Sequence, residues 1–159
     1  MLTVLSDAVV EFMNVARSVA VGTCDDKHIP YGTRVAAVRI WPDRQHVTAF
    51  LAEAIAARTL ANLRANPRVG IQVSNPPDHR TLQLKGVLYA TRNAEPDDRA
   101  YIEQFIEELG HSVEGFGMPF ERIVRMNAWP AIAIDVRVDE IFLQTPGPGA
   151  GRPLAGRAP

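Results

Sequence analysis

The chain has one cysteine, Cys24, among its 159 residues. A single thiol excludes an internal disulfide and a zinc site built from several cysteines. We expect Cys24 to act as a small apolar residue near a strand end. The chain also lacks any apolar run near the roughly 18 residues that a membrane helix requires. Residues 1–18 have neither the basic start nor the cleavage site of a secretory signal. These absences predict a cytoplasmic protein that does not contact membranes.

Lysine is scarce, and neither sign of charge is in excess. Lys27 and Lys85 are the lysines, so fifteen of the seventeen basic residues are arginines. The formal net charge of −1 argues against a nucleic-acid-binding protein, which normally carries a basic excess. Arginine suits bidentate contacts with phosphate, but a GC-rich genome produces the same bias. Composition therefore does not by itself indicate a phosphate site.

The length and composition are those of one globular domain, with 47% hydrophobic and 22% charged residues. We predict a domain over residues 1–145 and a tail over residues 146–159. The tail is too rich in proline and glycine to pack by itself. Its sequence leaves open whether it is disordered or covers a partner chain.

Short segments with β-branched alternation dominate the pattern of elements. They predict an α+β fold, mainly β: a six-stranded antiparallel barrel with peripheral helices. The predicted strands are residues 19–24, 28–41, 45–52, 68–74, 80–92 and 131–143. The predicted helices are residues 5–16, capped by Ser6 or Asp7, 53–65, 95–109, ended by Gly110, and 120–126.

The last predicted strand alternates more regularly than the others. Its even-numbered residues from Ile132 to Val138 are apolar, so they are expected to face the core. Asp135, Arg137 and Asp139 are then expected to face water.

The helix after the third strand begins without a capping residue. Its first residues are Ala52-Glu53-Ala54-Ile55-Ala56-Ala57, and the first basic residue is Arg58. Helix starts leave about four N–H groups unpaired, and Ser, Thr, Asp or Asn usually caps them. Such a start can bind an anion together with a nearby guanidinium. The alternative is that water binds the free N–H groups.

The other motifs do not indicate a functional site. The segment TPGPGAGR (145–152) lacks the Gly-Lys-Ser/Thr ending of a phosphate loop, and Pro153 blocks the helix that would bind the phosphate. The four histidines are scattered without metal-ligand spacing, so no metal site is predicted. No nucleophile stands beside a base, so no catalytic residue is assigned.

Four stretches stand in a fixed order along the chain: TRVAAVR (33–39), TAFLA (48–52), ARTLANLRANPRVGIQV (57–73) and RTLQLKG (80–86). This order resembles the pyridoxamine 5′-phosphate oxidase-like, FMN-binding split barrels. That family has an arginine-bearing strand, a Phe/Tyr strand, Ser-Arg/Lys-Lys opening a helix, an Asn-Pro strand and an Arg-Gln-Val-x-x-x-Gly strand. The resemblance covers about residues 15–92.

The resemblance implies FMN at the two-fold interface of a homodimer, with eight residues of this chain around it. Arg34 and Arg39 would lie along the flavin and its ribityl-phosphate chain, and Arg58 would hold the phosphate at the helix start. Val35 and Thr59 would also contact the cofactor. The residues toward the flavin ring would be Phe50 with the backbone of its strand, Thr81 and Gln83.

Three positions depart from the family pattern. Ala57 replaces the serine, Thr59 the second basic residue, and Thr81 the glutamine. Strand alternation also places Arg34 and Arg39 on opposite faces, so both reach one ligand only if the strand bends or bulges.

The resemblance favours a flavin-dependent oxidoreductase that acts on an unknown small substrate. The first alternative is a non-catalytic flavin- or haem-binding carrier or sensor. The second is a dimer that has a structural role and no cofactor.

Overall fold

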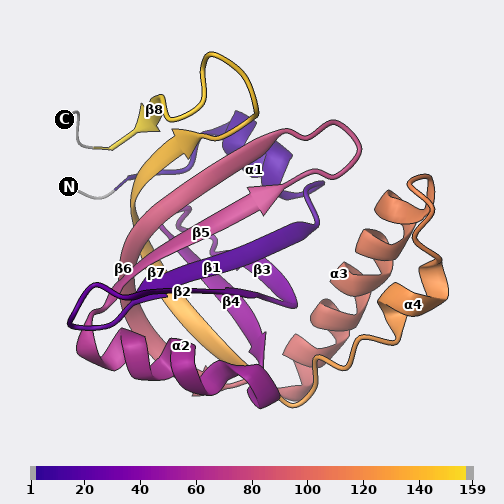
Figure 1. The fold of residues 1–159 in the computed structure, drawn as a ribbon, viewed down its shortest axis with the longest axis horizontal. Helices are drawn as coiled ribbons and strands as arrows, with labels where there is room; N and C mark the ends of the chain where they lie inside the picture. Colours follow the sequence, from indigo (N-terminus) through magenta and orange to yellow (C-terminus); the bar gives the residue numbers. More distant parts are fainter. Residues whose placement is uncertain (1–2, 157–159) are drawn as a thin grey trace.

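The computed structural model describes residues 3–156, which form one antiparallel sheet curled into a split barrel, with helices outside it (Figure 1). The sheet order is β2-β1-β5-β6-β7-β4-β3, with β8 added to β7. The strands are β1 (Ser18–Cys24), β2 (Pro30–Arg34), β3 (Ala37–Ile40), β4 (His46–Ala52), β5 (Arg68–Ser74), β6 (Thr81–Asn93), β7 (Ala131–Leu143) and β8 (Pro153–Ala155). The helices are α1 (Asp7–Met13), α2 (Glu53–Ala65), α3 (Pro96–Glu114) and α4 (Phe120–Val124). The predicted fold class is confirmed.

The described residues form eight strands instead of the predicted six, because the second predicted strand breaks at Val35 and Ala36 and because residues 153–155 add β8. The Val35 N–H donates to the carbonyl of Val19 on β1 at 3.2 Å. The next N–H, of Ala36, donates to the carbonyl of Phe50 on β4 at 2.7 Å. The chain thus changes neighbours between two residues, which places β2 and β3 at opposite ends of the sheet and closes the barrel.

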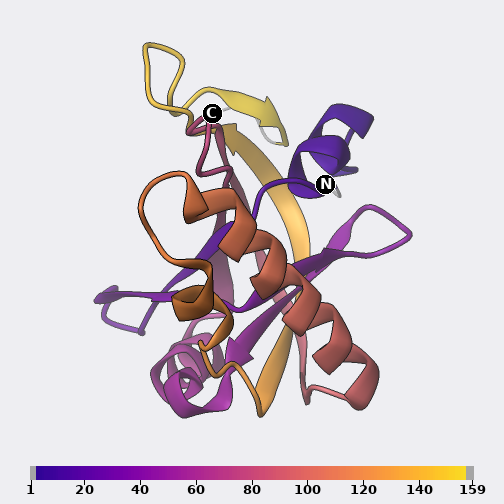
Figure 2. The same ribbon diagram turned by 90° about the vertical axis from the view of Figure 1, so that its right-hand side faces the viewer.

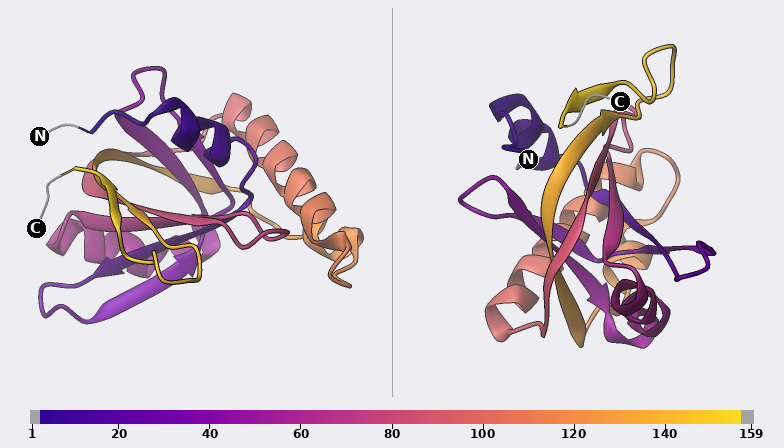
Figure 3. Two further views of the ribbon diagram at one scale, coloured as in Figure 1. Left: turned by 90° about the horizontal axis from the view of Figure 1, so that it is seen from above. Right: turned by 90° about the vertical axis from the view of Figure 1, so that its left-hand side faces the viewer.

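Helices cover the openings and one side of the barrel. Figure 2 shows α3 across that side with α4 beside it, and the Tyr101 hydroxyl of α3 donates to the Val38 carbonyl of β3 at 2.7 Å. Figure 3 shows α1 and β8 together at one end. Residues 153–155 of the proline- and glycine-rich tail supply β8. No helix within residues 3–156 is long and apolar enough to span a membrane.

The predicted N-cap of α1 and the predicted end of α2 are confirmed. Ser6 caps α1 by accepting a hydrogen bond from the Val9 N–H at 3.4 Å, and α2 ends at Ala65, with Asn66 as its C-cap before Pro67. The predicted end of α3 at Gly110 is wrong, because the helix continues to Glu114. Gly110 is buried instead, and a Cβ there would lie 2.7 Å from the Phe120 ring. This glycine allows α3 and α4 to approach closely.

The predicted exposure of Asp135 is also wrong, since this residue is only 5% exposed. Its carboxylate accepts a hydrogen bond from the Thr48 hydroxyl at 2.6 Å. Trp41 donates its indole N–H to the same hydroxyl at 2.8 Å. Both faces of β7 are therefore covered at this point, and strand alternation fails to place the carboxylate in water.

Gly86 and Gly70 provide a matched test of the sheet. A Cβ on Gly86 would lie 2.1 Å from the backbone carbonyl oxygen of Arg137, whereas a Cβ on Gly70 would meet Gln83 Nε2 at 3.8 Å. We expect Gly86→Ala to lower the free energy of unfolding by about 3 kcal/mol, because backbone atoms must move. Gly70→Ala should not lower it and is expected to raise it by about 0.5–1 kcal/mol, because alanine suits a strand better than glycine. Urea denaturation of both variants measures the difference, and equal stabilities would contradict the register between β6 and β7.

Candidate functional site

The start of α2 has no side-chain cap. The helix begins directly where β4 ends, with Ala52 at the N-cap position. The Glu53 N–H donates to the Pro130 carbonyl at 2.8 Å. Within residues 3–156, no side chain accepts from the remaining N–H groups of the first turn. The helix start therefore keeps donors and a positive dipole end that can bind an anion.

Arg58 lies on the second turn of α2, about 8 Å along the axis from the first helical residue. Its guanidinium carbon lies 4.7 Å from the ring centroid of Tyr31 on β2. The helix is held there by Asn62, whose amide donates to the buried Thr23 hydroxyl of β1 at 3.1 Å. Arg58 is thus directed along β2 by a cation–π contact.

Arg58 and Arg34 carry charges that are not neutralised locally. Both side chains belong to exposed residues. No carboxylate among the described residues lies within 4.0 Å of either guanidinium. Both are therefore free to bind an external anion.

Arg39 differs, because its charge is already paired. Its Nη1 donates to the Asp98 carboxylate at 2.7 Å, and Arg92 donates to the other carboxylate oxygen at 2.5 Å. The Arg39 guanidinium also lies 4.2 Å from the Tyr101 ring centroid. Burial alone would raise the pKa of Asp98, but hydrogen bonds from Arg92, the Glu95 N–H and Arg39 outweigh it and lower the pKa to about 2.

Three glycines lie side by side on the outer face of the sheet. The strand register pairs Gly32 of β2 with Gly22 of β1, and Gly22 with Gly70 of β5. Lys85 of β6 continues this row. We call Gly32, Gly22 and Gly70 the glycine platform. It forms the floor of a groove of about 970 Å³, whose walls include Arg68, Gln83 and Glu140.

The barrel's own packing does not require these glycines. A Cβ on Gly22 or Gly32 would have no heavy atom closer than 4.0 Å or 3.9 Å respectively. A glycine inside a strand costs about 0.5–1 kcal/mol relative to alanine. Glycines that the fold does not need mark a place where a ligand or another backbone approaches closely. The platform is therefore a candidate contact surface.

The other predicted site residues are mostly buried. Val35 lies at the strand break, and Phe50 is fully buried beside Tyr101. Thr59 faces the core, and its hydroxyl has no hydrogen-bond partner within residues 3–156. The buried Thr81 hydroxyl donates to the Ser74 hydroxyl at 2.9 Å. Gln83 is partly exposed on the outer face of β6.

The eight predicted residues do not converge at one point of a single chain. Arg34 and Gln83 share a row across the outer face, with Ala20 and Gln72 between them. Three strand spacings separate them, about 14 Å. Arg58 lies against Tyr31, whose neighbour on β1 is Thr23 and not a platform glycine. One chain thus carries two separate groups of residues, which we call half-sites: Arg34 with Gln83 on the outer face, and Arg58 with the start of α2.

Sequence reasoning missed the glycine platform, Tyr31 and Asp98. Glycines in strand interiors were a readable signal for the platform. The Asp98 pairing joins residues 59 positions apart, so no local pattern predicts it. No cluster of three or more His, Cys, Asp or Glu that could hold a metal ion occurs in the part of the chain that the structure describes.

Comparisons with known proteins support the fold. The sequence pattern of the pyridoxamine 5′-phosphate oxidase family matches residues 5–137. No curated protein matches the chain in sequence. HupZ from Group A Streptococcus shares 17% identity and superposes with a TM-score of 0.56 over 92% of this chain and 98% of its own. An FMN-binding protein from Syntrophomonas wolfei shares 14% identity, with a TM-score of 0.50 over 84% of this chain and 86% of its own.

Asp98 should contribute stability that depends on pH. Its folded-state pKa is lowered, so the contribution is complete above the unfolded-state pKa near 4 and is lost as the pH falls through about 2. We expect Asp98→Asn to lower the free energy of unfolding by about 2 kcal/mol at pH 7, and by much less near pH 2. Asp97→Asn, at the exposed neighbouring residue, is the control. Urea denaturation at both pH values tests this, and a pH-independent loss would contradict it.

Proposed function

Because the chain belongs to the pyridoxamine 5′-phosphate oxidase family, we propose that it binds FMN between two copies of itself and is a flavin-dependent oxidoreductase for a small substrate. The family match over residues 5–137 carries this proposal. When bound, FMN supplies two-electron redox chemistry. The protein supplies the position of the cofactor and the charges around it.

In this proposal the phosphate of FMN binds at the uncapped start of α2 near Arg58, and Arg34 lies with Gln83 in the other half-site. A phosphate dianion needs donors and positive charge, and both guanidiniums lack a carboxylate partner within residues 3–156. Arg39 is less available to a phosphate, because its guanidinium is already hydrogen-bonded to Asp98, which it shares with Arg92. Ala57 and the buried Thr59 bring no exposed donor. We therefore expect this chain to hold the phosphate with few charged contacts.

The two half-sites support a dimer. Arg58 and Gln83 do not meet within one chain, so we propose that a second copy facing the glycine platform supplies the other half of the site. The groove carries both signs of charge, with Arg68 and Lys85 on one side and Asp139 and Glu140 on the other. Such a surface is able to pair with itself across a two-fold axis.

FMN titration tests the role of Arg58. We expect Arg58→Ala to weaken FMN binding about 10- to 150-fold, because one charge-assisted contact is lost. Arg64→Ala is the matched control, since Arg64 is also an exposed arginine of α2 but lies in its last turn. Flavin fluorescence gives the affinities. Equal affinities for wild type and Arg58→Ala would remove Arg58 from the site. A Soret band with added haemin, and no FMN binding, would support the haem-binding alternative.

A bulky residue on the glycine platform tests the dimer. Gly22→Val adds methyl groups where the chain itself leaves space, and valine favours strands, so thermal stability should not fall. We expect the dimer dissociation constant to rise at least about tenfold and FMN affinity to fall with it. Gly115→Val, at the C-cap of α3, is the control, because a Cβ there would meet no atom of the described residues within 4 Å. Sedimentation velocity and FMN titration measure both effects, and an unchanged dimer would contradict the proposed face.

A further inference from the structure

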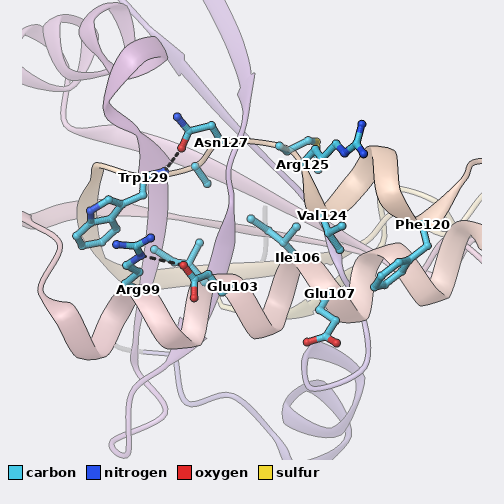
Figure 4. Close-up of a pocket in the computed structure, with 12 residues that line it drawn as sticks. Arg99, Glu103, Ile106, Glu107, Phe120, Val124, Arg125, Asn127 and Trp129 are labelled. Atoms are coloured by element: carbon cyan, nitrogen blue, oxygen red, sulfur yellow. Dashed lines mark hydrogen bonds and ion pairs between the residues drawn. The ribbon is translucent and has the colours of Figure 1, made fainter.

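A second hollow lies between α3 and the segment that follows α4, away from the groove described above (Figure 4). Its volume is about 520 Å³, within the range of about 300–1,000 Å³ typical of small-molecule pockets. α3 supplies one wall, and residues 124–129 supply the other. The close packing of Phe120 on Gly110 fixes the position of α4 beside α3.

Apolar side chains form the floor and the two ends of this hollow, although five of its twelve lining residues are polar or charged. Ile102 and Ile106 are buried residues of α3 that form its floor. Phe120 and Trp129 lie at its two ends (Figure 4). Val124, which is 40% exposed, lies at the rim. Aromatic side chains at the ends and aliphatic side chains on the floor suit a flat ring. A bound ring would also remove the Val124 side chain from water.

The charged groups around the hollow are already paired or point elsewhere. Arg99 donates to the Glu103 carboxylate at 2.8 Å and lies 5.6 Å from the Trp129 ring centroid. Glu107 and Arg125 point away from the hollow (Figure 4). The four charged lining residues sum to zero, so the hollow has no net charge that would attract a charged ligand.

Asn127 orders the segment that forms the second wall. Its side-chain oxygen accepts a hydrogen bond from the Trp129 backbone N–H at 3.1 Å.

We propose that this hollow binds a small, uncharged, planar aromatic molecule. The ring would lie over Ile102 and Ile106 between Phe120 and Trp129. This site is separate from the proposed flavin site and does not depend on FMN binding.

N-phenyl-1-naphthylamine is a suitable probe, because it is uncharged, planar in its naphthyl part and fluorescent in apolar surroundings. Its sulfonated analogue, 8-anilino-1-naphthalenesulfonate, has the same rings and a negative charge. With the full chain, we expect saturable binding of the uncharged probe and at least about tenfold weaker binding of the anionic one. Quenching of Trp129 emission, in a Trp41→Phe background, should follow the same titration.

Two variants test whether the probe binds in this hollow. Ile106→Trp fills the floor, and Val124→Gln makes the exposed rim polar without burying a new group. Each should weaken binding of the uncharged probe about tenfold. Val15→Gln is the control, because Val15 is 52% exposed and lies outside the hollow. If Ile106→Trp does not fold, Val124→Gln alone decides the test.

Three results would overturn the proposal. The first is equal binding of the charged and uncharged probes. The second is binding that Val124→Gln leaves unchanged, which would place the probe elsewhere. The third is probe binding that decreases as protein concentration rises, which would mean that another copy of the chain covers the hollow. FMN affinity, measured in parallel, should be the same in Val124→Gln and wild type.

Discussion

The two backbone hydrogen bonds at Val35 and Ala36 determine how the rest of this structure is arranged. They pair successive residues with β1 and β4, which lie on either side of the barrel opening. A single extended segment thereby becomes two strands at opposite ends of one sheet. The outer face of β1, β2 and β5 is left uncovered by helices, whereas α3 covers the side of β3. The division between an open face and a covered side follows from this closure.

The open and covered sides use side chains differently. On the open face, Gly32, Gly22 and Gly70 leave a floor without side chains, although their own surroundings would accept a methyl group. On the covered side, Gly110 is a glycine because a Cβ would collide with Phe120, and in β6 Gly86 is a glycine because a Cβ would collide with the backbone of Arg137. Glycine therefore occurs in this chain for two different physical reasons. Only the second kind is explained by the packing of the chain itself.

The pairing of Asp98 with Arg39 changes what the family resemblance predicts for this chain. The resemblance gives Arg39 a place along the cofactor, but Asp98 and Tyr101 of α3 already bind its guanidinium. Arg34 and Arg58 remain uncommitted within the described residues. Positive charge available to a cofactor is consequently concentrated near β2 and the start of α2. A flavin site in this chain would depend more strongly on these two arginines.

The sequence alone determined features that neighbouring residues control. Ser6 at the start of α1, Asn66-Pro67 at the end of α2, the bare start of α2 and the mainly-β antiparallel class follow from capping, proline geometry and alternation. The tertiary structure decided the continuation of α3 past Gly110, the burial of Asp135 and the pairing of Arg39. Each depends on a group far away in the chain that covers or contacts the residue. Local patterns describe one face of one element, and burial of the other face is decided only when a distant element packs against it.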